Sequence, residues 1–206
     1  MTTKSNFEAA YENGTAGWVI DQPQPAVLEL DRAGLIRGAV LEPGAGTGEH
    51  TIALTERGHD ILGIDFADSA ITRARENAAA HGVPARFEVA DALALTGPAR
   101  YETVLDSALF HVFDGESGRA YAEALHRVCL PGALVHILAL AEAEPRVGPQ
   151  ISQGTIRAAF GADWKIESIE QSSYRVSVSE KHWAETGLPV GILDRPAWLA
   201  CIRHLG

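Results

Sequence analysis

Three glycines at alternate positions, Gly44, Gly46 and Gly48, form the stretch of this chain that is best suited to hold a ligand. They follow a short apolar run that ends in an acid, Glu42, and they precede a segment of helix-forming residues. Glycine lets the backbone turn sharply and lets a ligand approach bare main chain. The first turn of a helix offers free N–H groups to an anion or a polar edge. The order of apolar run, glycine turn and helix predicts the first half of a βαβ unit.

The spacing of these glycines distinguishes the loop from two other ligand-binding loops. A dinucleotide-binding fingerprint has glycine at its first, third and sixth positions, whereas the sixth position counted from Gly44 is Glu49. A P-loop ends in Gly-Lys followed by Ser or Thr, and that ending does not follow this loop. The loop therefore favours a different ligand, with a tight turn that binds nothing as the alternative.

Acidic residues follow each of the next three apolar runs. Asp65, Asp91 and Asp106 each end such a run or come directly after it. In parallel sheets with helical crossovers, ligands bind beyond the carboxyl ends of the strands, near the point where strand order reverses. Together with Glu42, these acids are therefore expected to surround one ligand.

Asp65 and Asp91 each have a specific candidate role. Asp65 can accept hydrogen bonds from both hydroxyls of a ribose; the alternative is a cap on the next helix, for which Asp68 is better placed. Phe66 can lie against an adenine ring, and core packing is an equal alternative. Asp91 and the backbone amide of Ala92 can bind an adenine edge, and a plain turn cap is the alternative there.

The segment LDSALFHVF, which contains Asp106, offers residues for chemistry at an acceptor. Ser107 and Ala108 are small enough for a ligand to approach their main chain, and Asp106 is a candidate catalytic acid. His111 titrates near neutral pH, so it could take a proton from an acidic hydroxyl group or orient that group. A lone histidine is more often a structural hydrogen-bonding residue, and this alternative stays open.

Together these motifs resemble those of class I S-adenosylmethionine-dependent methyltransferases. The resemblance rests on LEPGAGTGEH as motif I, IDFADSAITRAR as the ribose segment, VADA as the adenine segment and VLDSALFHVF as motif IV. It implies a Rossmann-like α/β fold with a doubly wound, mostly parallel, seven-stranded sheet and helices on both faces. It also implies S-adenosyl-L-methionine as cofactor, S-adenosylhomocysteine as product, and no metal.

The stretch GTAGWVIDQPQPAV resembles the N-terminal lid of the thiopurine and halide/thiol methyltransferase branch. Combined with DSALFHVF, it resembles the heterocyclic-toxin methyltransferases of actinobacteria, which implies O-methylation, and so detoxification, of a hydroxyquinolone- or phenol-like compound. Transfer to a thiol or thiopurine sulfur is the alternative, and a cofactor-binding sensor module without catalysis is a third possibility. The cofactor-binding residues that the resemblance implies are Trp18, Glu42, Gly44, Ala45, Gly46, Asp65, Phe66, Asp91, Ala92 and Ser107.

Within this resemblance, Glu42 would stand close to the positively charged methionine end of the cofactor. Trp18 could close over the sulfonium, since aromatic faces attract cations, although a core position is its usual role. His111, Tyr174 and Trp183 are predicted to line the acceptor pocket. Trp198 could add an aromatic face there, and ordinary packing is as good an explanation for each aromatic residue. Methyl transfer to an ionised oxygen needs mostly proximity and alignment, so a base could be dispensable.

Alternating strands and helices must position these residues, which predicts right-handed crossovers and a mostly parallel sheet. The predicted helices span residues 5–11, 25–33, 47–57, 68–81, 117–130 and 152–161. The predicted strands span residues 39–42, 60–65, 86–90, 101–106, 133–140, 164–173, 174–179 and 197–203. We expect one domain: N-terminal helices and lid in 1–34, a cofactor-binding core in 35–140 and an acceptor-side part in 141–206.

Composition narrows the function classes. A chain of 206 residues with 46% hydrophobic residues fits one globular domain. Its net charge of −10 argues against a nucleic acid partner, since phosphate binding relies on clustered Lys and Arg. The two cysteines lack metal-ligand spacing, and neither a membrane span nor a secretory signal is expected. These features predict a cytoplasmic protein, a monomer or homodimer, with a small aromatic acceptor as its partner.

The cofactor assignment has a direct test. S-adenosylhomocysteine is expected to raise the melting temperature, and NAD is not; a shift with NAD alone would exclude the family. Asp65→Ala is expected to weaken S-adenosylhomocysteine binding several-fold or more, because charge-assisted hydrogen bonds are worth roughly 1.5–3 kcal/mol each. Unchanged affinity, measured by titration calorimetry, would place the ribose elsewhere.

Overall fold

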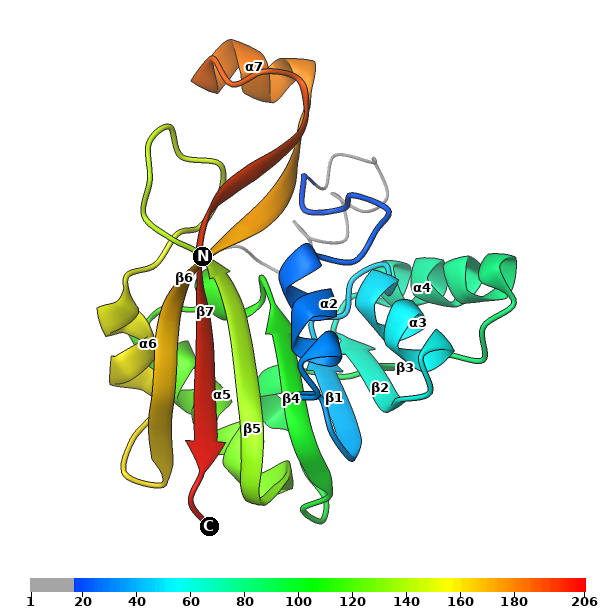
Figure 1. Cartoon of the computed structure of the whole chain (residues 1–206), viewed down its shortest axis with the longest axis vertical. Coiled ribbons are helices and arrows are strands. Elements are labelled where there is room, and N and C mark those ends of the chain that lie inside the picture. The colour runs from blue at the N-terminus through cyan, green and yellow to red at the C-terminus, as the bar shows by residue number, and fades with distance from the viewer. Residues whose placement is uncertain (1–16) are drawn as a thin grey trace.

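The computed structural model describes residues 17–206, apart from the side chains of residues 181 and 182. The helix predicted at residues 5–11 lies outside the described part of the chain. Seven strands form one sheet in the order β3-β2-β1-β4-β5-β7-β6 (Figure 1). They are β1 (Ala39–Pro43), β2 (Asp60–Asp65), β3 (Arg86–Val89), β4 (Tyr101–Ser107), β5 (Cys129–Leu140), β6 (Trp164–Val178) and β7 (Gly191–His204).

Helices alternate with the first five strands, except that only a 3₁₀ turn lies between β3 and β4. They are α2 (Pro25–Arg32), α3 (Glu49–Glu56), α4 (Asp68–His81), α5 (Gly115–Val128), α6 (Gln153–Ala159) and α7 (Glu180–Thr186), with the 3₁₀ turns η1 (Ala92–Ala94) and η2 (Phe110–Val112). Helix α7 was not predicted, because Pro189 and Gly191 indicate only the loop that follows it. No helix among residues 17–206 has both the length and the apolar character needed to cross a membrane.

The direction of the strands confirms the α/β class and corrects one detail. β1, β2, β3, β4 and β5 pair in parallel. β7 instead pairs antiparallel with both β5 and β6. Parallel neighbours need a crossover, whereas a chain that turns back directly can pair antiparallel. β6 and β7 therefore form an antiparallel hairpin at one edge of an otherwise parallel sheet.

The C-terminal hairpin also differs from the prediction in its length. The strands predicted at 164–173 and 174–179 are one continuous strand, β6. β7 begins at Gly191 rather than at residue 197, and it includes Pro196. Its pairing with β5 ends at Ala197, and the Pro196 carbonyl accepts the Ala141 N–H just beyond that end, so the missing N–H of Pro196 affects only the end of the ladder.

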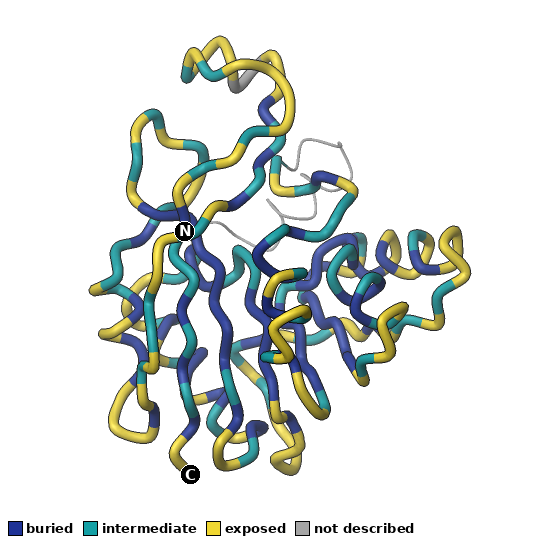
Figure 2. The backbone as a smooth tube through the Cα atoms, in the orientation of Figure 1, coloured by how far each residue is buried: buried dark blue, intermediate teal, exposed yellow. Residues whose placement is uncertain are grey.

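Alternation of side chains along the strands decides which helices cover each face. Val40 and Leu105 pack with Val27 of α2, whereas Leu41 and Val104 belong to the core under α5. Helices α2, α3 and α4 cover one face of the sheet, and α5 and α6 cover the other (Figure 1). The central strands between these layers are buried along most of their length (Figure 2). The carboxyl ends of β1, β2 and β4 consequently meet at one edge between the two layers.

Candidate active site

The glycine loop after β1 is held against the loops after β2 and β4. Ala45 donates its N–H to the Ile64 carbonyl at 2.9 Å, and Gly46 donates its N–H to Asp65 Oδ2 at 3.1 Å. Gly44 has a φ of +69°, and a Cβ added there would lie 2.9 Å from the Cβ of Leu109. Both the backbone conformation and this close contact require glycine. The loop therefore presents bare backbone at the carboxyl edge, as predicted.

Asp65 lies at the end of β2 and is only 6% exposed. Its Oδ1 accepts a hydrogen bond from Ala67 N–H at 2.9 Å, and its Oδ2 accepts the one from Gly46. Burial raises the pKa of this carboxyl above its ordinary value, while the backbone bonds oppose the rise. Each carboxylate oxygen has two lone pairs, so this arrangement leaves capacity for the hydroxyls of a ligand.

The helix cap expected from Asp68 is not formed. The N-cap position of α4 is Ala67, and no side-chain cap bond is present there. Asp65 itself fixes the start of the helix through the Ala67 N–H. Phe66 packs with Val19, Ala67 and Ala70, so it joins the N-terminal segment to α4. Its contact with an adenine ring stays a prediction.

Glu42, at the end of β1, is enclosed rather than open to a ligand. It is 1% exposed, accepts a hydrogen bond from the Thr51 hydroxyl, and is bonded to His50 Nδ1 at 2.8 Å. His50 Nε2 in turn accepts the Gln24 N–H at 3.1 Å. Burial lowers the pKa of His50, but the Glu42 carboxylate, with Glu49, raises it further than burial lowers it. The Gln24 N–H nevertheless needs a lone pair on Nε2, which favours the neutral ring with its proton on Nδ1.

Gln24 ties the segment before α2, which we call the lid segment (residues 17–24), to β6. Its side chain donates to the Arg175 carbonyl at 3.0 Å and accepts from the Arg175 N–H at 2.8 Å. The Gly17 carbonyl also accepts the Ser177 N–H at 2.8 Å. Sequence reasoning missed this anchor, because Gln24 and Arg175 are 151 residues apart. The two prolines that flank Gln24 are the only local sign, since they make the backbone extended.

Asp91 takes the role of a turn cap. It is exposed, and its Oδ1 accepts the Leu93 N–H at 2.9 Å at the start of η1. Ala92 is 9% exposed and packs in the core beside it. The second carboxylate oxygen can still accept a bond, so an adenine contact stays a prediction.

Asp106 and Ser107 point to opposite faces of β4. Asp106 is fully buried toward α5, and its Oδ1 accepts the N–H groups of Leu109 and Phe110. Burial raises the pKa of its carboxyl to about 7. The backbone N–H groups of Phe110 and Leu109 and the Tyr121 hydroxyl oppose this rise. The Tyr121 hydroxyl faces Oδ2 but does not complete a well-formed hydrogen bond. Asp106 has no exposed surface and shapes the η2 turn; its catalytic role stays a prediction.

Ser107 faces the lid side of β4. Its buried Oγ does not complete a well-formed hydrogen bond within the described residues, although the Tyr174 hydroxyl lies close enough for Ser107 to lower the pKa of Tyr174. The neighbouring Ala108 has a φ of +71°, a conformation that a non-glycine residue adopts only under strain. Buried hydroxyls normally have a partner, so Ser107 is positioned to bond to a ligand at the end of β4.

His111 lies in η2, in the gap between the carboxyl ends of β4 and β5. Its Nδ1 accepts the Leu140 N–H at 3.1 Å. The residue is 8% exposed, and burial lowers its pKa to about 4. A neutral ring whose Nδ1 accepts a hydrogen bond carries its proton on Nε2. His111 therefore lies where an acceptor was predicted, but the lone pair that a proton acceptor needs is already used.

The aromatic residues Tyr174 and Trp198, in the C-terminal part of the chain, lie on opposite faces of the sheet. Tyr174 is 4% exposed and packs with Ala26 of α2 on the lid side of the sheet. Burial raises the pKa of its hydroxyl well above the ordinary value, while the nearby Ser107 and Gln24 side chains oppose the rise. Trp198 packs on the opposite face, in the core under α5, and donates to the Ile151 carbonyl at 3.2 Å. One flat ring cannot lie between Tyr174 and Trp198.

The two remaining tryptophans are partly open. Trp183 is 55% exposed on α7, at the far end of the arm that β6 and β7 form beyond the rest of the sheet (Figure 1). Trp18 is 37% exposed in the lid segment. The predicted contacts of Trp183 with an acceptor and of Trp18 with the cofactor stay predictions.

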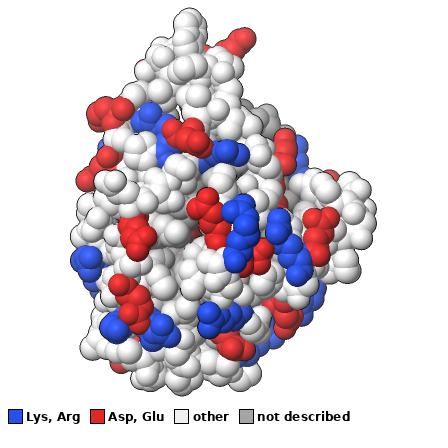
Figure 3. Space-filling model, viewed as in Figure 1, with Lys and Arg blue, Asp and Glu red and all other residues white. Residues whose placement is uncertain are grey.

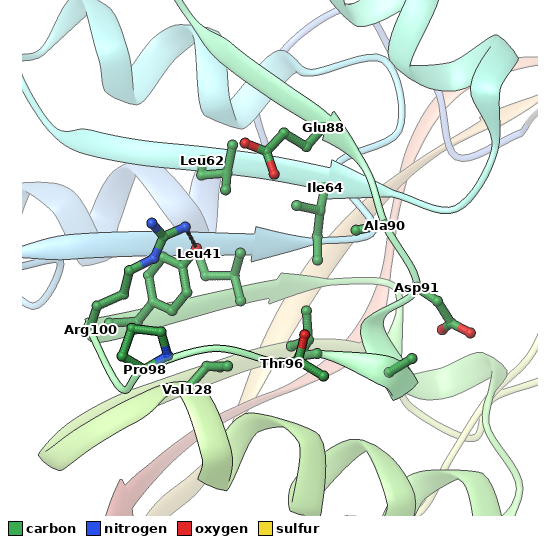
Figure 4. A pocket seen from close by; sticks show the side chains of 13 residues that line it. Leu41, Leu62, Ile64, Glu88, Ala90, Asp91, Thr96, Pro98, Arg100 and Val128 are labelled. Carbon is green, nitrogen blue, oxygen red and sulfur yellow. Dashed lines mark hydrogen bonds between the residues drawn. The ribbon is translucent and has the colours of Figure 1, made fainter.

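A separate cavity lies on the α5 side of the sheet. It has a volume of about 360 Å³, and Leu41, Leu62 and Ile64 form its apolar floor (Figure 4). It extends along the strands from Arg100 to Asp91 (Figure 4). His50 and the lid segment lie on the opposite face of the sheet from this cavity.

Two further properties concern metal-ligating groups and surface charge. Among the described residues, no group of three or more His, Cys, Asp or Glu side chains is arranged to hold a metal ion. On the face seen in Figure 3, acidic and basic side chains are interspersed, and no field of one sign covers it.

Comparison with known proteins identifies the family. Residues 40–132 match the family described as a methyltransferase domain. The chain is 35% identical over 158 residues to the 2-heptyl-1-hydroxyquinolin-4(1H)-one methyltransferase of Mycobacteroides abscessus, which covers 74% of this chain and 70% of that protein. The chain belongs to the class I S-adenosylmethionine-dependent methyltransferases.

Solved structures agree with this assignment. One, from work on the conversion of a disulfide bond into a thioacetal group during echinomycin biosynthesis, matches with a TM-score of 0.86 and 38% identity over 98% of this chain and 92% of the other. The fold is also that of the 1,6-didemethyltoxoflavin-N1-methyltransferase of Burkholderia thailandensis, solved with S-adenosylhomocysteine. That match has a TM-score of 0.71 and 20% identity, and it covers 98% of this chain and 87% of the other.

The described residues of this methyltransferase fit S-adenosylmethionine, its cofactor. Gly44 and Gly46 offer bare backbone, Asp65 offers free lone pairs to a ribose, and the Ser107 hydroxyl needs a partner. Glu42 differs from the expectation of a direct contact, because His50 and Thr51 enclose it. Its negative charge still lies at this edge of the sheet, where a positive methionine end would benefit from it.

Gly44→Ala tests the loop. The variant is expected to weaken S-adenosylhomocysteine binding by about tenfold or more, because Ala is strained at φ +69° and its Cβ would press on Leu109. Gly34→Ala is the matched control: it has a similar φ of +66° with nothing within 4 Å. Calorimetric titration should show near wild-type affinity for the control. Equal losses in both variants would show that the contact with Leu109 is unimportant.

Asp106→Asn tests the assignment of Asp106 to the fold. Because the pKa of about 7 lies above the ordinary 3.8, the stability that this group contributes is present at acid pH and is lost as pH rises toward and through 7. Asn keeps an oxygen for both backbone N–H groups and carries no charge. We expect the variant to gain melting temperature relative to wild type at pH 8 but not at pH 5, and to retain methyl transfer.

Asp106→Ala is the control, and it should destabilise the protein at both pH values because two N–H groups lose their acceptor. A difference between Asp106→Asn and wild type that is the same at pH 5 and pH 8 would contradict the raised pKa. Loss of methyl transfer in a well-folded Asp106→Asn variant would support a catalytic role for the carboxylate.

Proposed function

We propose that this methyltransferase transfers the methyl group of S-adenosylmethionine to the oxygen of a small, flat, hydroxylated heteroaromatic compound of the hydroxyquinolone or phenol type. The observation that carries the proposal is the 35% identity to a hydroxyquinolone methyltransferase over 158 residues. That match is longer than the methyltransferase domain over residues 40–132. It therefore extends into the lid or the C-terminal part, where the acceptor is expected to bind.

The chain's own residues would bind and align the reactants. When bound, S-adenosylmethionine supplies a methyl group on a positively charged sulfur, which an oxygen nucleophile can take by in-line displacement. The glycine loop and Asp65 would hold the cofactor at the ends of β1 and β2. His111 approaches from the gap between β4 and β5, and Tyr174 approaches from β6 under the lid segment. Holding two reactants in line accounts for a large part of such a rate enhancement.

The lid segment would help to keep water out. Gln24 bonds it to β6 on one side and to His50 on the other. A closed site strengthens the electrostatic interactions inside it. Replacing an acidic O–H by an ether removes a titratable group from the compound, which is why we propose detoxification as the result. The cytoplasmic location, the small aromatic partner and the division of one domain at residues 34 and 140 stay predictions.

A sulfur acceptor is the second candidate. It is favoured by the 38% identity, over 98% of the chain, to the structure from the work on thioacetal formation from a disulfide. The cofactor side of the site would be the same for both acceptors. Only the groups that meet the acceptor, His111 and Tyr174 among them, would differ in what they recognise.

A panel of acceptors decides between these functions. Purified protein with S-adenosylmethionine is incubated with N-hydroxyquinolones, phenols and aryl thiols of similar shape, and products are identified by mass. We expect methylated oxygen on the hydroxylated heteroaromatics. Product from thiols alone would establish the sulfur alternative. Binding of S-adenosylhomocysteine without any product would favour a sensor module that has lost catalysis.

A further inference from the structure

We propose that the acceptor enters this site already ionised, and that the His111 Nε2–H donates a hydrogen bond to its anionic oxygen or sulfur instead of removing a proton. The enzyme would then select, by acidity, compounds that lose a proton near or below neutral pH. This inference rests on the proposed function and specifies the substrate class for the same site. N-hydroxylated heteroaromatics and aryl thiols share the required chemistry, an acidic O–H or S–H group.

The direction of the hydrogen bond at His111 carries the argument. Leu140 is the last residue of β5, and its carbonyl accepts the Ile151 N–H at 3.0 Å. Its N–H is directed at His111 Nδ1 at 3.1 Å. A backbone N–H can only donate, so Nδ1 must be the acceptor and Nε2 must carry the proton of the neutral ring. Nε2 forms no hydrogen bond with any residue in the described part of the chain, so its proton is available to a ligand.

Conversion of His111 into a base would be costly. A second ring proton would have to bind to Nδ1, where it would face the Leu140 N–H. Two donors would then meet, and the buried Leu140 N–H would lose its acceptor. Burial alone lowers the pKa of His111 to about 4, and no described charge shifts it. The buried titratable groups toward the carboxyl edge of the neighbouring elements include Asp106 on β4, Tyr121 on α5 and Tyr174 on β6.

None of these neighbours can replace His111 as a base. Asp106 has no exposed surface. Burial raises the pKa values of the Tyr174 and Tyr121 hydroxyls well above the ordinary value, so both hydroxyls stay protonated. Glu42 is 1% exposed and bonded to His50 and Thr51. Within residues 17–206, His111 and these neighbours therefore offer a hydrogen-bond donor and no free proton acceptor.

The chemical step balances without a base. The acceptor loses its proton to solvent before it binds. Its anionic oxygen or sulfur then forms a bond to the methyl carbon, the carbon–sulfur bond of the cofactor breaks, and the electron pair stays on that sulfur. An anion and a cation give two neutral products. A hydroxyl with a pKa of about 10, the ordinary value of a phenol, is ionised to only about one part in a thousand at pH 7.

The test is a set of pH profiles of kcat/KM with acceptors of one shape and different acidity. Ring-substituted N-hydroxyquinolones form one arm and aryl thiols of matched size form the other. We expect the midpoint of each rising limb to equal the acceptor's own pKa in solution. A midpoint common to all acceptors would reveal a titrating group of the enzyme and would overturn the inference alone. Absence of product with every acceptor, while S-adenosylhomocysteine still binds, would overturn the proposed function and this inference with it.

Variants at His111 sharpen the result. His111→Gln keeps an oxygen acceptor and an N–H donor but cannot act as a base at any useful pH. It should retain kcat/KM within about tenfold of wild type and show the same pH limb. His111→Leu removes the donor and should lose about ten- to a hundredfold, with its pH midpoint unchanged. A Gln variant as inactive as the Leu variant would contradict donation as the role.

His136→Gln is the matched control. Like His111, His136 is buried and bonded to one backbone group, here the Leu35 carbonyl at 3.3 Å. It lies in the middle of β5, away from the site. This control should leave the rate and the pH profile unchanged. The melting-temperature shift with S-adenosylhomocysteine confirms that each variant is folded, and the Gln variant decides the question if His111→Leu does not fold.

Discussion

The bonds of the buried Asp65 carboxylate to two backbone N–H groups are the interaction on which the cofactor side of this methyltransferase depends. Gly46 belongs to the loop after β1 and Ala67 to the start of α4, so one side chain fixes two elements at the carboxyl edge. Burial makes an ionised carboxylate expensive, and charge-assisted bonds from backbone N–H groups offset that cost. The same group can accept further bonds, so the residue that organises the edge is also suited to hold a ribose.

A second chain of bonds connects the two ends of the sequence. Glu42 holds His50, His50 accepts the N–H of Gln24, and Gln24 pairs through its side chain with the backbone at Arg175. The acid of the glycine motif is therefore used inside the protein, to place α3 and the lid segment. The negative charge of Glu42 would therefore act on a positively charged ligand across a short distance, without direct contact. This arrangement connects the lid segment by hydrogen bonds to the end of β1, directly before the glycine loop.

The alternation of side chains along the strands places the remaining candidate site residues on opposite faces of the sheet. Adjacent residues in β4 point to opposite faces, so Asp106 enters the core under α5 while Ser107 faces the lid side. The same rule separates Tyr174 from Trp198 across the sheet. At the gap between β4 and β5, the N–H of Leu140 decides the tautomer of His111. The chemistry of the acceptor side follows from these directions and from burial, and not from the types of the residues alone.

The sequence by itself determined the parts that depend on local pattern. The alternate glycines, the apolar runs that end in acids, and the alternation of strands and helices predicted the family, the cofactor and the parallel core, because these signals act over a few residues. Only the tertiary structure decided the antiparallel hairpin of β6 and β7, the pairing of Gln24 with Arg175, the burial of Asp106 and the direction of the proton on His111. Each of these depends on which distant backbone group lies opposite a side chain, and no local pattern encodes that.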